Sequence, residues 1–261
     1  MKLMSKDVMH DLLDGGQVQL SDGDKAFAEA YPQDVVYVSI PAPVTPLPSS
    51  ESARNLYEAI HEEATRKLDG DHPFRDYPWM WQKCNEFRET EGTYYPLEAD
   101  RLVAGFSMGL PVADLIKDCS DLVSKIEAHL AGIPPSNIVS TTEPLSERVL
   151  CLCLATNHIN LAHLSEAAGD FQTALLHARA AAASNLRADG PKTLRADYHY
   201  IEAVTIIQIA RLSGREMDPM AIDAFQVARE LDPDGSRLAL RKAEYNDLEI
   251  LEEESEKTNH A

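Results

Sequence analysis

One short stretch of the chain has the spacing of a catalytic motif. Gly105-Phe106-Ser107-Met108-Gly109 matches G-x-S-x-G, in which a strained strand-to-helix turn projects the serine hydroxyl toward a histidine base and the donors of an oxyanion hole. Residues 99–106 would form that strand. Such a hydrolase also needs further strands and a downstream acid and histidine, whereas residues 112–251 carry helical patterns throughout. We therefore assign no catalytic residue, expect a glycine-containing loop between helices, and keep a hydrolase acting through Ser107 as the alternative.

Histidine, aspartate and cysteine side chains form no recognisable metal site in the sequence. His158 and His163 are five residues apart, so a helix would point them to different sides, unlike the four-residue spacing of helical metal sites. Asp69, Asp71 and His72 cluster, but no further ligand follows at a suitable spacing. The cysteines, which show no disulfide framework, are Cys84, Cys119, Cys151 and Cys153. We expect reduced core cysteines, no metal and no cofactor.

The charge balance limits the classes of partner. The chain has 261 residues and a net charge of −19, without a basic patch that could neutralise phosphates, so nucleic-acid binding is disfavoured. An acidic surface would complement a basic partner, although a solvated surface is the simpler explanation. The N-terminal residues lack the apolar core of a signal peptide, and the strongest apolar run, 149–155, is too short to span a membrane. We expect a cytoplasmic protein.

Three segments follow one another along the chain. Residues 1–50 have the pattern of an irregular arm, with a short extended segment at 34–40 and a proline-rich stretch after it. Residues 51–135 have the periodicity of a helical subdomain, in which prolines at 78 and 111 open the second and third helices. Residues 136–261 are predicted to form helical repeats that end in a capping helix.

Aromatic residues surround the second predicted helix, which runs from Pro78 to about Gly92. They include both tryptophans of the chain: Phe74, Tyr77, Trp79, Trp81, Phe87, Tyr94 and Tyr95. We expect them to form the core of the helical subdomain, because no polar constellation accompanies them. The alternative is that they line the pocket of a small-molecule sensor.

A helical hairpin is predicted over residues 158–184, where two helical patterns flank Gly169-Asp170. Gly169 can adopt the left-handed conformation that ends the first helix, and Asp170 can cap the second. Apolar or small residues recur on a helical period on both sides of this turn: Ile159, Ala162, His163, Ala167, Phe171, Ala174, Leu175, Ala178 and Ala181. Such small residues allow close packing of neighbouring helices.

Part of this hairpin occurs a second time. Residues 221–233, AIDAFQVARELDP, repeat its second helix, with Ala221, Phe225 and Ala228 at the positions of Ala174, Ala178 and Ala181. Over about residues 144–251 the chain resembles the tetratricopeptide repeat family, whose helix pairs stack into a superhelix with a concave groove. The copies are 221 − 174 = 47 residues apart, against about 34 in the family. A divergent array with a long helix near 193–212 is therefore expected, closed by one amphipathic helix that contains Leu240, Ala243, Leu248 and Leu251.

The resemblance implies a groove that is lined by the first helix of each pair. In this sequence those positions are Thr156, Ile159, Asn160, His163 and Glu166, and then Ile201, Val204, Gln208 and Arg211. Some family members clamp a terminal carboxylate with lysine, arginine and asparagine. Asn160 matches that asparagine, but Ile201 and Thr205 occupy the places of the basic pair. We therefore expect a segment that binds by hydrogen bonds and shape instead of a carboxylate clamp.

Together these patterns predict an all-α protein: a tetratricopeptide-repeat-like solenoid, a helical subdomain before it and an irregular N-terminal arm. The expected function is that of a non-enzymatic adaptor or assembly factor, whose groove binds a peptide or a protein. The binding residues would be Thr156, Asn160, His163, Glu166, Gln208 and Arg211. Self-association through the repeats is a further possibility, and the alternative function is that of a helical enzyme or small-molecule sensor.

Overall fold

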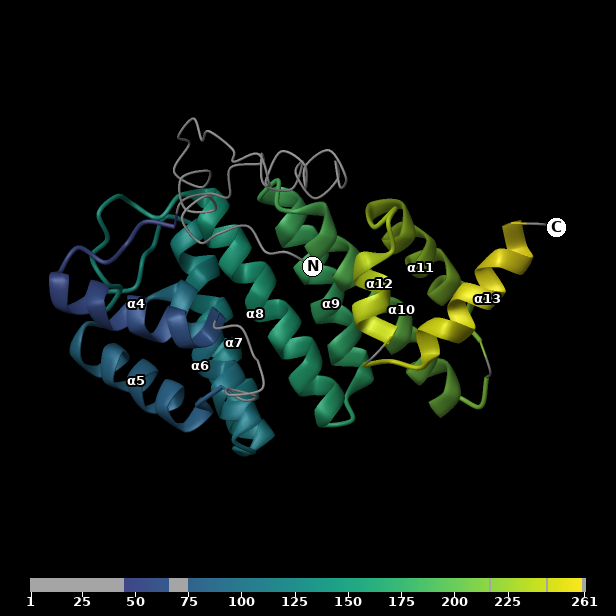
Figure 1. Cartoon of the computed structure of the whole chain (residues 1–261), viewed down its shortest axis with the longest axis horizontal. Coiled ribbons are helices and arrows are strands. Elements are labelled where there is room, and N and C mark those ends of the chain that lie inside the picture. The colour runs from purple at the N-terminus through teal and green to yellow at the C-terminus, as the bar shows by residue number, and fades with distance from the viewer. Residues whose placement is uncertain (1–44, 66–74, 216, 243, 260–261) are drawn as a thin grey trace, which may run out of the picture. The chain divides into compact units, whose positions relative to one another are not determined.

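The described part of the molecule is helical. The computed structural model describes residues 45–65, 75–215, 217–242 and 244–259, and its helices belong to one compact unit, Leu47–Ala261. These residues form ten α-helices and no β-strand (Figure 1). Isolated β-bridges join Pro48 to Thr141 and Thr93 to Ile138. The prediction of an all-α protein is therefore confirmed, while the predicted extended segment and the Asp69, Asp71 and His72 cluster lie outside the described residues.

Helices α4 to α7 build the first half of this unit. They are α4 (Glu51–Thr65), α5 (Tyr77–Thr90), α6 (Tyr95–Ser107) and α7 (Val112–Leu130). The predicted starts of two helices are confirmed. In α5, Pro78 lies in the first turn and Asp76 accepts a hydrogen bond from the Trp79 amide, and Pro111 directly precedes α7. The aromatic residues behave mainly as core, since Phe87, Tyr94 and Tyr95 are each at most 1% exposed.

The stretch that resembles a nucleophile elbow is helical. Residues 99–106, which would form its strand, belong to α6, and Ser107 is the last residue of that helix. Gly105 lies inside this helix. The position requires a glycine, because the first carbon of any side chain there would lie 2.7 Å from the ring of Trp81. Only Gly109, with a φ of +74°, forms a turn of the expected kind. The strand-turn-helix arrangement of a hydrolase is absent from these residues.

Helices α8 to α11 form two consecutive pairs. They are α8 (Glu147–Ala167), α9 (Phe171–Arg187), α10 (Lys192–Leu212) and α11 (Pro219–Leu231), and each packs against the next in the chain. The predicted turn between α8 and α9 is confirmed: Gly169 has a φ of +78°, and Asp170 accepts a hydrogen bond from the Thr173 amide. Ala174, Ala178 and Ala181 are fully buried, so α9 lies close to both neighbours.

The contacts between helices continue across the predicted boundary at residues 135–136. Both α6 and α7 pack against α8 (Figure 1). One apolar cluster joins Tyr95 and Leu115 from the first half to Leu150 and Leu161 of α8. The helices before and after the boundary therefore share a core.

The single capping helix predicted at the C-terminus is wrong, because the chain forms α12 (Ser236–Lys242) and α13 (Asp247–Asn259) there. Leu240 was expected to face the core and is 57% exposed, whereas Leu238, Leu248 and Leu251 are buried together against α10 and α11. At about 100° per residue, a continuous helix would turn Leu238 about 80–140° away from the other two. The break brings all three leucines into the same core.

Candidate functional site

The predicted binding residues lie on two first helices of the pairs. Thr156, Asn160, His163 and Glu166 belong to α8, and Gln208 and Arg211 to α10. Spacings of three and four residues place the α8 side chains along one side of that helix. A hydrogen bond of 3.0 Å between the Thr205 hydroxyl and Oε1 of Glu166 joins the two helices. We call the surface with these six residues the binding face.

Two other predicted groove residues are not accessible. Ile201 and Val204 of α10 are 0% and 1% exposed. Ile201 packs with Ala162 and Ala178, and Val204 belongs to the core beneath α11. These two positions of α10 therefore pack in the core and cannot line a groove.

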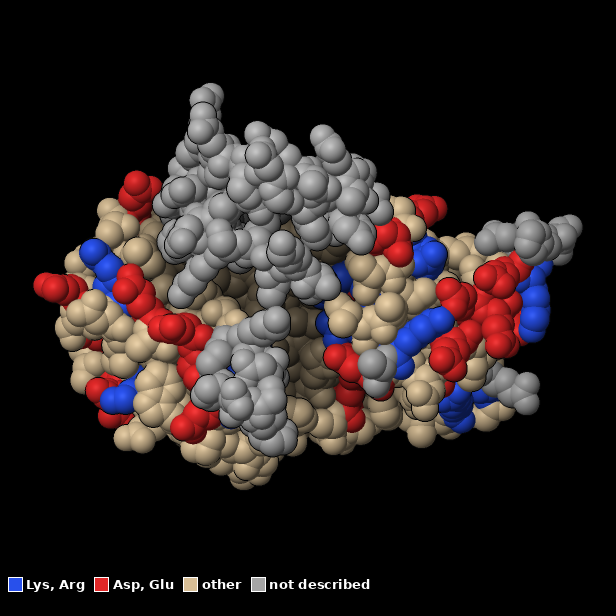
Figure 2. Space-filling model, viewed as in Figure 1, with Lys and Arg blue, Asp and Glu red and all other residues tan. Residues whose placement is uncertain are grey.

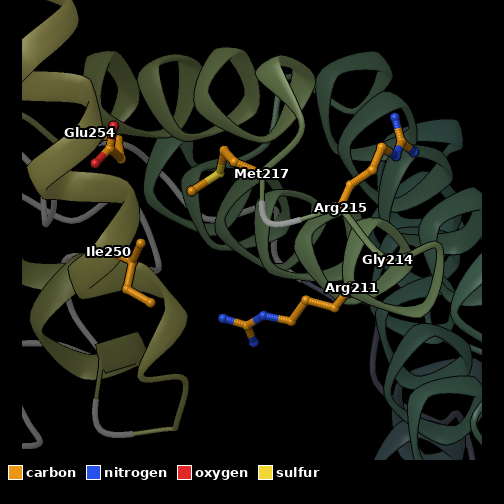
Figure 3. A pocket seen from close by; sticks show the side chains of 6 residues that line it. All are labelled: Arg211, Gly214, Arg215, Met217, Ile250 and Glu254. Atoms are coloured by element: carbon orange, nitrogen blue, oxygen red, sulfur yellow. The ribbon is translucent and has the colours of Figure 1, made fainter.

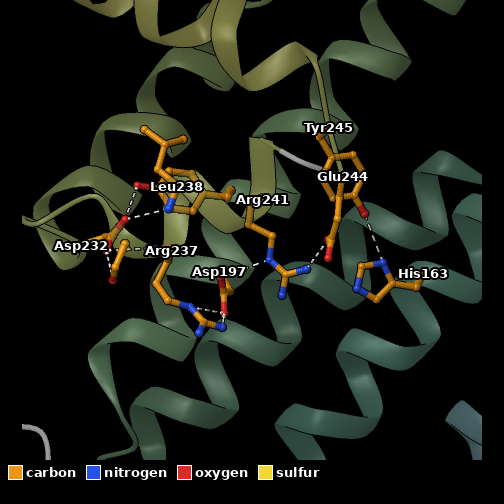
Figure 4. A network of polar contacts seen from close by, with 10 residues as sticks. His163, Asp197, Asp232, Arg237, Leu238, Arg241, Glu244 and Tyr245 are labelled. Carbon is orange, nitrogen blue, oxygen red and sulfur yellow. Dashed lines mark hydrogen bonds and ion pairs between the residues drawn. The ribbon is translucent and has the colours of Figure 1, made fainter. Parts of the chain in front are cut away.

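A segment of the chain itself occupies part of the binding face. The hydroxyl of Tyr245, in the turn between α12 and α13, donates a hydrogen bond of 3.2 Å to Oε2 of Glu166 and lies 3.3 Å from Nδ1 of His163 (Figure 4). Burial, together with the charge of Glu166, raises the pKa of Tyr245 above its usual range, so the phenol remains a neutral donor. Its ring packs against Ala162 and Ile201.

Asp247, two residues later, binds the α10 half of the face. Its carboxylate accepts a hydrogen bond of 2.6 Å from Nε2 of Gln208 and forms an ion pair of 2.6 Å with Nη2 of Arg211. We call residues 245–247 the Tyr245–Asp247 segment. Four of the six predicted residues therefore contact this segment. Sequence reasoning missed it, although Asn246-Asp247 in a predicted helix is a pair that favours turns.

Thr156 and Asn160 make no contact with the Tyr245–Asp247 segment. The exposed Thr156 hydroxyl donates to the carbonyl of Leu152, one turn earlier in α8. The partly buried Asn160 has an Nδ2 group with no hydrogen-bond acceptor among the described residues. The surface is hollowed between α8 and α12 (Figure 2). On the α8 half of the face, the Asn160 amide nitrogen therefore has no hydrogen-bond partner among the described residues.

An ion cluster fixes α12 on α10 beside this face. The carboxylate of Asp197, 1% exposed, binds the guanidinium groups of both Arg237 and Arg241 (Figure 4). Its Oδ1 lies 3.1 Å from Nε of Arg241. Glu244 balances the second arginine with a contact of 2.5 Å. Because both guanidinium groups have carboxylate partners, they hold the fold together and leave no free basic pair.

Two pockets of about 540 Å³ each lie on the described surface. In the first, side chains from the end of α10 and from α13 face each other, and Arg211 forms part of its wall (Figure 3). The second lies beside α5, α6 and α7, where Trp81 lines it together with Arg88, Arg101 and Asp118. Trp81 is the one member of the predicted aromatic cluster in that lining.

Ser107 has none of the surroundings of a catalytic serine. It is exposed at the end of α6, and within the described residues its hydroxyl makes no hydrogen bond to a histidine. The same residues contain no group of three or more His, Cys, Asp or Glu side chains that could hold a metal ion. None of the helices described has the length and apolar character needed to cross a membrane.

A pair of histidines, which the sequence did not indicate, connects α8 to α9. The Nδ1 atoms of His158 and His177 lie 3.2 Å apart, and the rings stack with centroids 5.2 Å apart. Burial, and then the neighbouring His177, lowers the pKa of His158 to about 4. The pair therefore excludes protons that the unfolded chain would bind near the ordinary histidine pKa of 6.5.

We predict that this pair makes the free energy of unfolding depend on pH. Because the folded pKa of His158 is lowered, its contribution is fully present above about pH 6.5 and is lost as the pH falls toward 4. The expected loss is about 2 kcal/mol between pH 7 and pH 4.5. Urea unfolding of the protein and of His158→Gln across this range measures it. Carboxyl groups contribute equally to both proteins, so parallel pH curves would contradict the prediction.

No protein-family model, no curated protein sequence and no solved structure matches this chain.

Proposed function

We propose that this protein is a non-enzymatic scaffold that binds a segment of a partner protein on the face formed by α8 and α10. The observation that carries the proposal is the internal contact at this face: two helices of different pairs already hold the turn before α13 and the first residue of that helix. His163 and Glu166 hold Tyr245, and Gln208 and Arg211 hold Asp247. Recognition by side chains from successive first helices is the mode that the tetratricopeptide repeat resemblance implies.

The α8 half of the face offers the contacts that a partner segment requires. An asparagine amide has two donor hydrogens and one acceptor oxygen, a set that matches a peptide backbone. The Nδ2 group of Asn160 is buried and has no acceptor among the described residues, whereas Thr156 is exposed one turn away. A bound segment would reach the Asn160 donor only by displacing the atoms that cover it. We propose that hydrogen bonding and shape determine affinity here, and that the partner need not carry a terminal carboxylate.

Substitution of Thr156 and Asn160, the two predicted residues that do not contact the Tyr245–Asp247 segment, tests the proposal. Thr156→Arg together with Asn160→Ala is expected to reduce partner capture about tenfold, because a hydrogen-bonding group is lost and a bulky side chain fills the surface. Capture from native lysate, quantified by mass spectrometry, measures the effect. Arg211 is left intact because it pairs with Asp247.

The matched control is Gln172→Arg, at an exposed position of α9. It adds the same charge away from α8 and should leave capture and far-ultraviolet circular dichroism unchanged. Equal capture by the face variant and by this control would contradict the proposed interface. Light scattering of the same samples separates capture of a partner from self-association.

A further inference from the structure

We infer that the partner segment carries a tyrosine followed two positions later by an aspartate or glutamate, and that the Tyr245–Asp247 segment is an internal copy of this ligand. The inference rests on the proposed function, since it specifies what the same face binds. The segment of the chain and the segment of the partner would then compete for the face.

The tyrosine site has apolar walls and a polar end. The ring of Tyr245 packs against the cluster of Ala162, Ala178 and Ile201, while Glu166 and His163 lie 3.2 and 3.3 Å from its hydroxyl. A phenol satisfies both parts of this site. A phenylalanine would fill the walls but leave Oε2 of the partly buried Glu166 carboxylate without that donor, and loss of a hydrogen bond to a charged group is costly. The site therefore selects tyrosine over phenylalanine.

The acidic position follows from the spacing of its partners. Gln208 and Arg211 are three residues apart on α10, and both reach the carboxylate of Asp247. Asn246, the residue between the two anchors, is exposed. The face therefore binds the side chains at the first and third positions of a tripeptide, while the side chain at the middle position is exposed to solvent.

The helices on either side of Tyr245 have apolar anchors of their own. Leu238 anchors α12, and Leu248 and Leu251 anchor α13, all of them buried against α10 and α11. Tyr245 is partly buried and packs against this core, Asp247 is 9% exposed, and the side chain of Arg211 is 43% exposed. A competing peptide would therefore have to displace two side chains, and its own tyrosine would have to replace the packing that Tyr245 gives up.

A peptide with the sequence of residues 242–249, KAEYNDLE, is the probe. The variant Tyr245→Ala with Asp247→Ala vacates both positions, and calorimetry should show that it binds this peptide at least about tenfold more tightly than the unaltered protein does. A peptide with phenylalanine at the tyrosine position, or asparagine at the aspartate position, should bind about tenfold more weakly than the original. Equal binding of the three peptides, or no binding of any, overturns the inference.

Two further variants keep the test informative. Asn246→Ala with Glu249→Ala alters exposed residues of the same stretch and should bind the peptide like the unaltered protein. If the vacated variant does not fold, Tyr245→Phe provides the readout. It removes only the hydroxyl contacts and should raise peptide affinity about threefold or more, whereas unchanged affinity overturns the inference.

Peptide display on the vacated variant separates this inference from the proposed function. Binders that lack an aromatic-x-acid pattern and are lost on Thr156→Arg with Asn160→Ala would overturn the inference and support the scaffold function. Recovery of no binder would contradict both. Enrichment of Tyr-x-Asp or Tyr-x-Glu sequences supports both.

Discussion

Alanine in place of Asp197 is expected to lower the free energy of unfolding by about 3 kcal/mol. Removal of one partner from a buried ion pair costs about 3–5 kcal/mol because the remaining charge stays desolvated. Asp197 is 1% exposed and binds both Arg237 and Arg241. These arginine side chains are 28% and 18% exposed, so partial hydration places the loss at the lower end. Urea unfolding of the two proteins measures the difference.

The matched control is Asp223→Ala, which removes an exposed aspartate from α11. Its expected effect is within about 0.5 kcal/mol. Hydrogen exchange adds a local readout, because loss of Asp197 should increase exchange in α12 more than in α8 and α9. A variant as stable as the control, or with uniform changes in exchange, would show that the arginines do not hold α12 through this carboxylate.

The parts of the fold that the sequence predicted correctly depend on local chemistry. Gly169 and Asp170 form the turn between α8 and α9 because a left-handed glycine and a capping carboxylate act within a few residues. Pro111 precedes α7 for an equally local reason. The stripe of buried alanines in α9 reflects a periodicity that is visible in sequence alone.

The errors come from contacts between residues that are distant in the chain. G-x-S-x-G resembled an elbow, but Trp81 requires a glycine at position 105 for packing within a helix. The break between α12 and α13 allows Leu238, Leu248 and Leu251 to reach one core. The prediction of one continuous helix placed Leu240 on the buried side, whereas Leu240 is exposed. Local periodicity cannot reveal which residues of other helices must be covered.

The internal occupant of the candidate site could not be predicted, for the same reason. The six residues of the face were predicted from the resemblance, and the structure places four of them in contact with the Tyr245–Asp247 segment. The occupant was not predicted, because Tyr245 is separated by 82 residues from His163 and by 79 from Glu166. A tyrosine in a predicted amphipathic helix carries no signal of such a contact. The polar groups that hold the internal segment and those that make no contact with it therefore looked alike in the sequence.

Asp232→Ala is expected to have the largest effect, a loss of about 4 kcal/mol in the free energy of unfolding. The carboxylate of Asp232 is fully buried between α11 and α12. It accepts hydrogen bonds from the Tyr200 hydroxyl at 3.1 Å and from the backbone amides of Arg237 and Leu238 at 3.2 and 2.9 Å. Alanine leaves the buried phenol and the first turn of α12 without these acceptors. Denaturant unfolding followed by circular dichroism measures the loss.

Asp234→Ala is the matched control, since Asp234 is exposed two residues later and accepts a hydrogen bond of 3.1 Å from the Ser236 amide. Its loss should stay within about 1 kcal/mol. Asp232→Asn should fall between the two, because the amide keeps one acceptor oxygen and replaces the other with a donor. If Asp232→Ala is no less stable than Asp234→Ala, apolar packing of Leu238 alone fixes the start of α12. The position of the Tyr245–Asp247 segment would then depend on that packing and on the Asp197 cluster, without the polar cap.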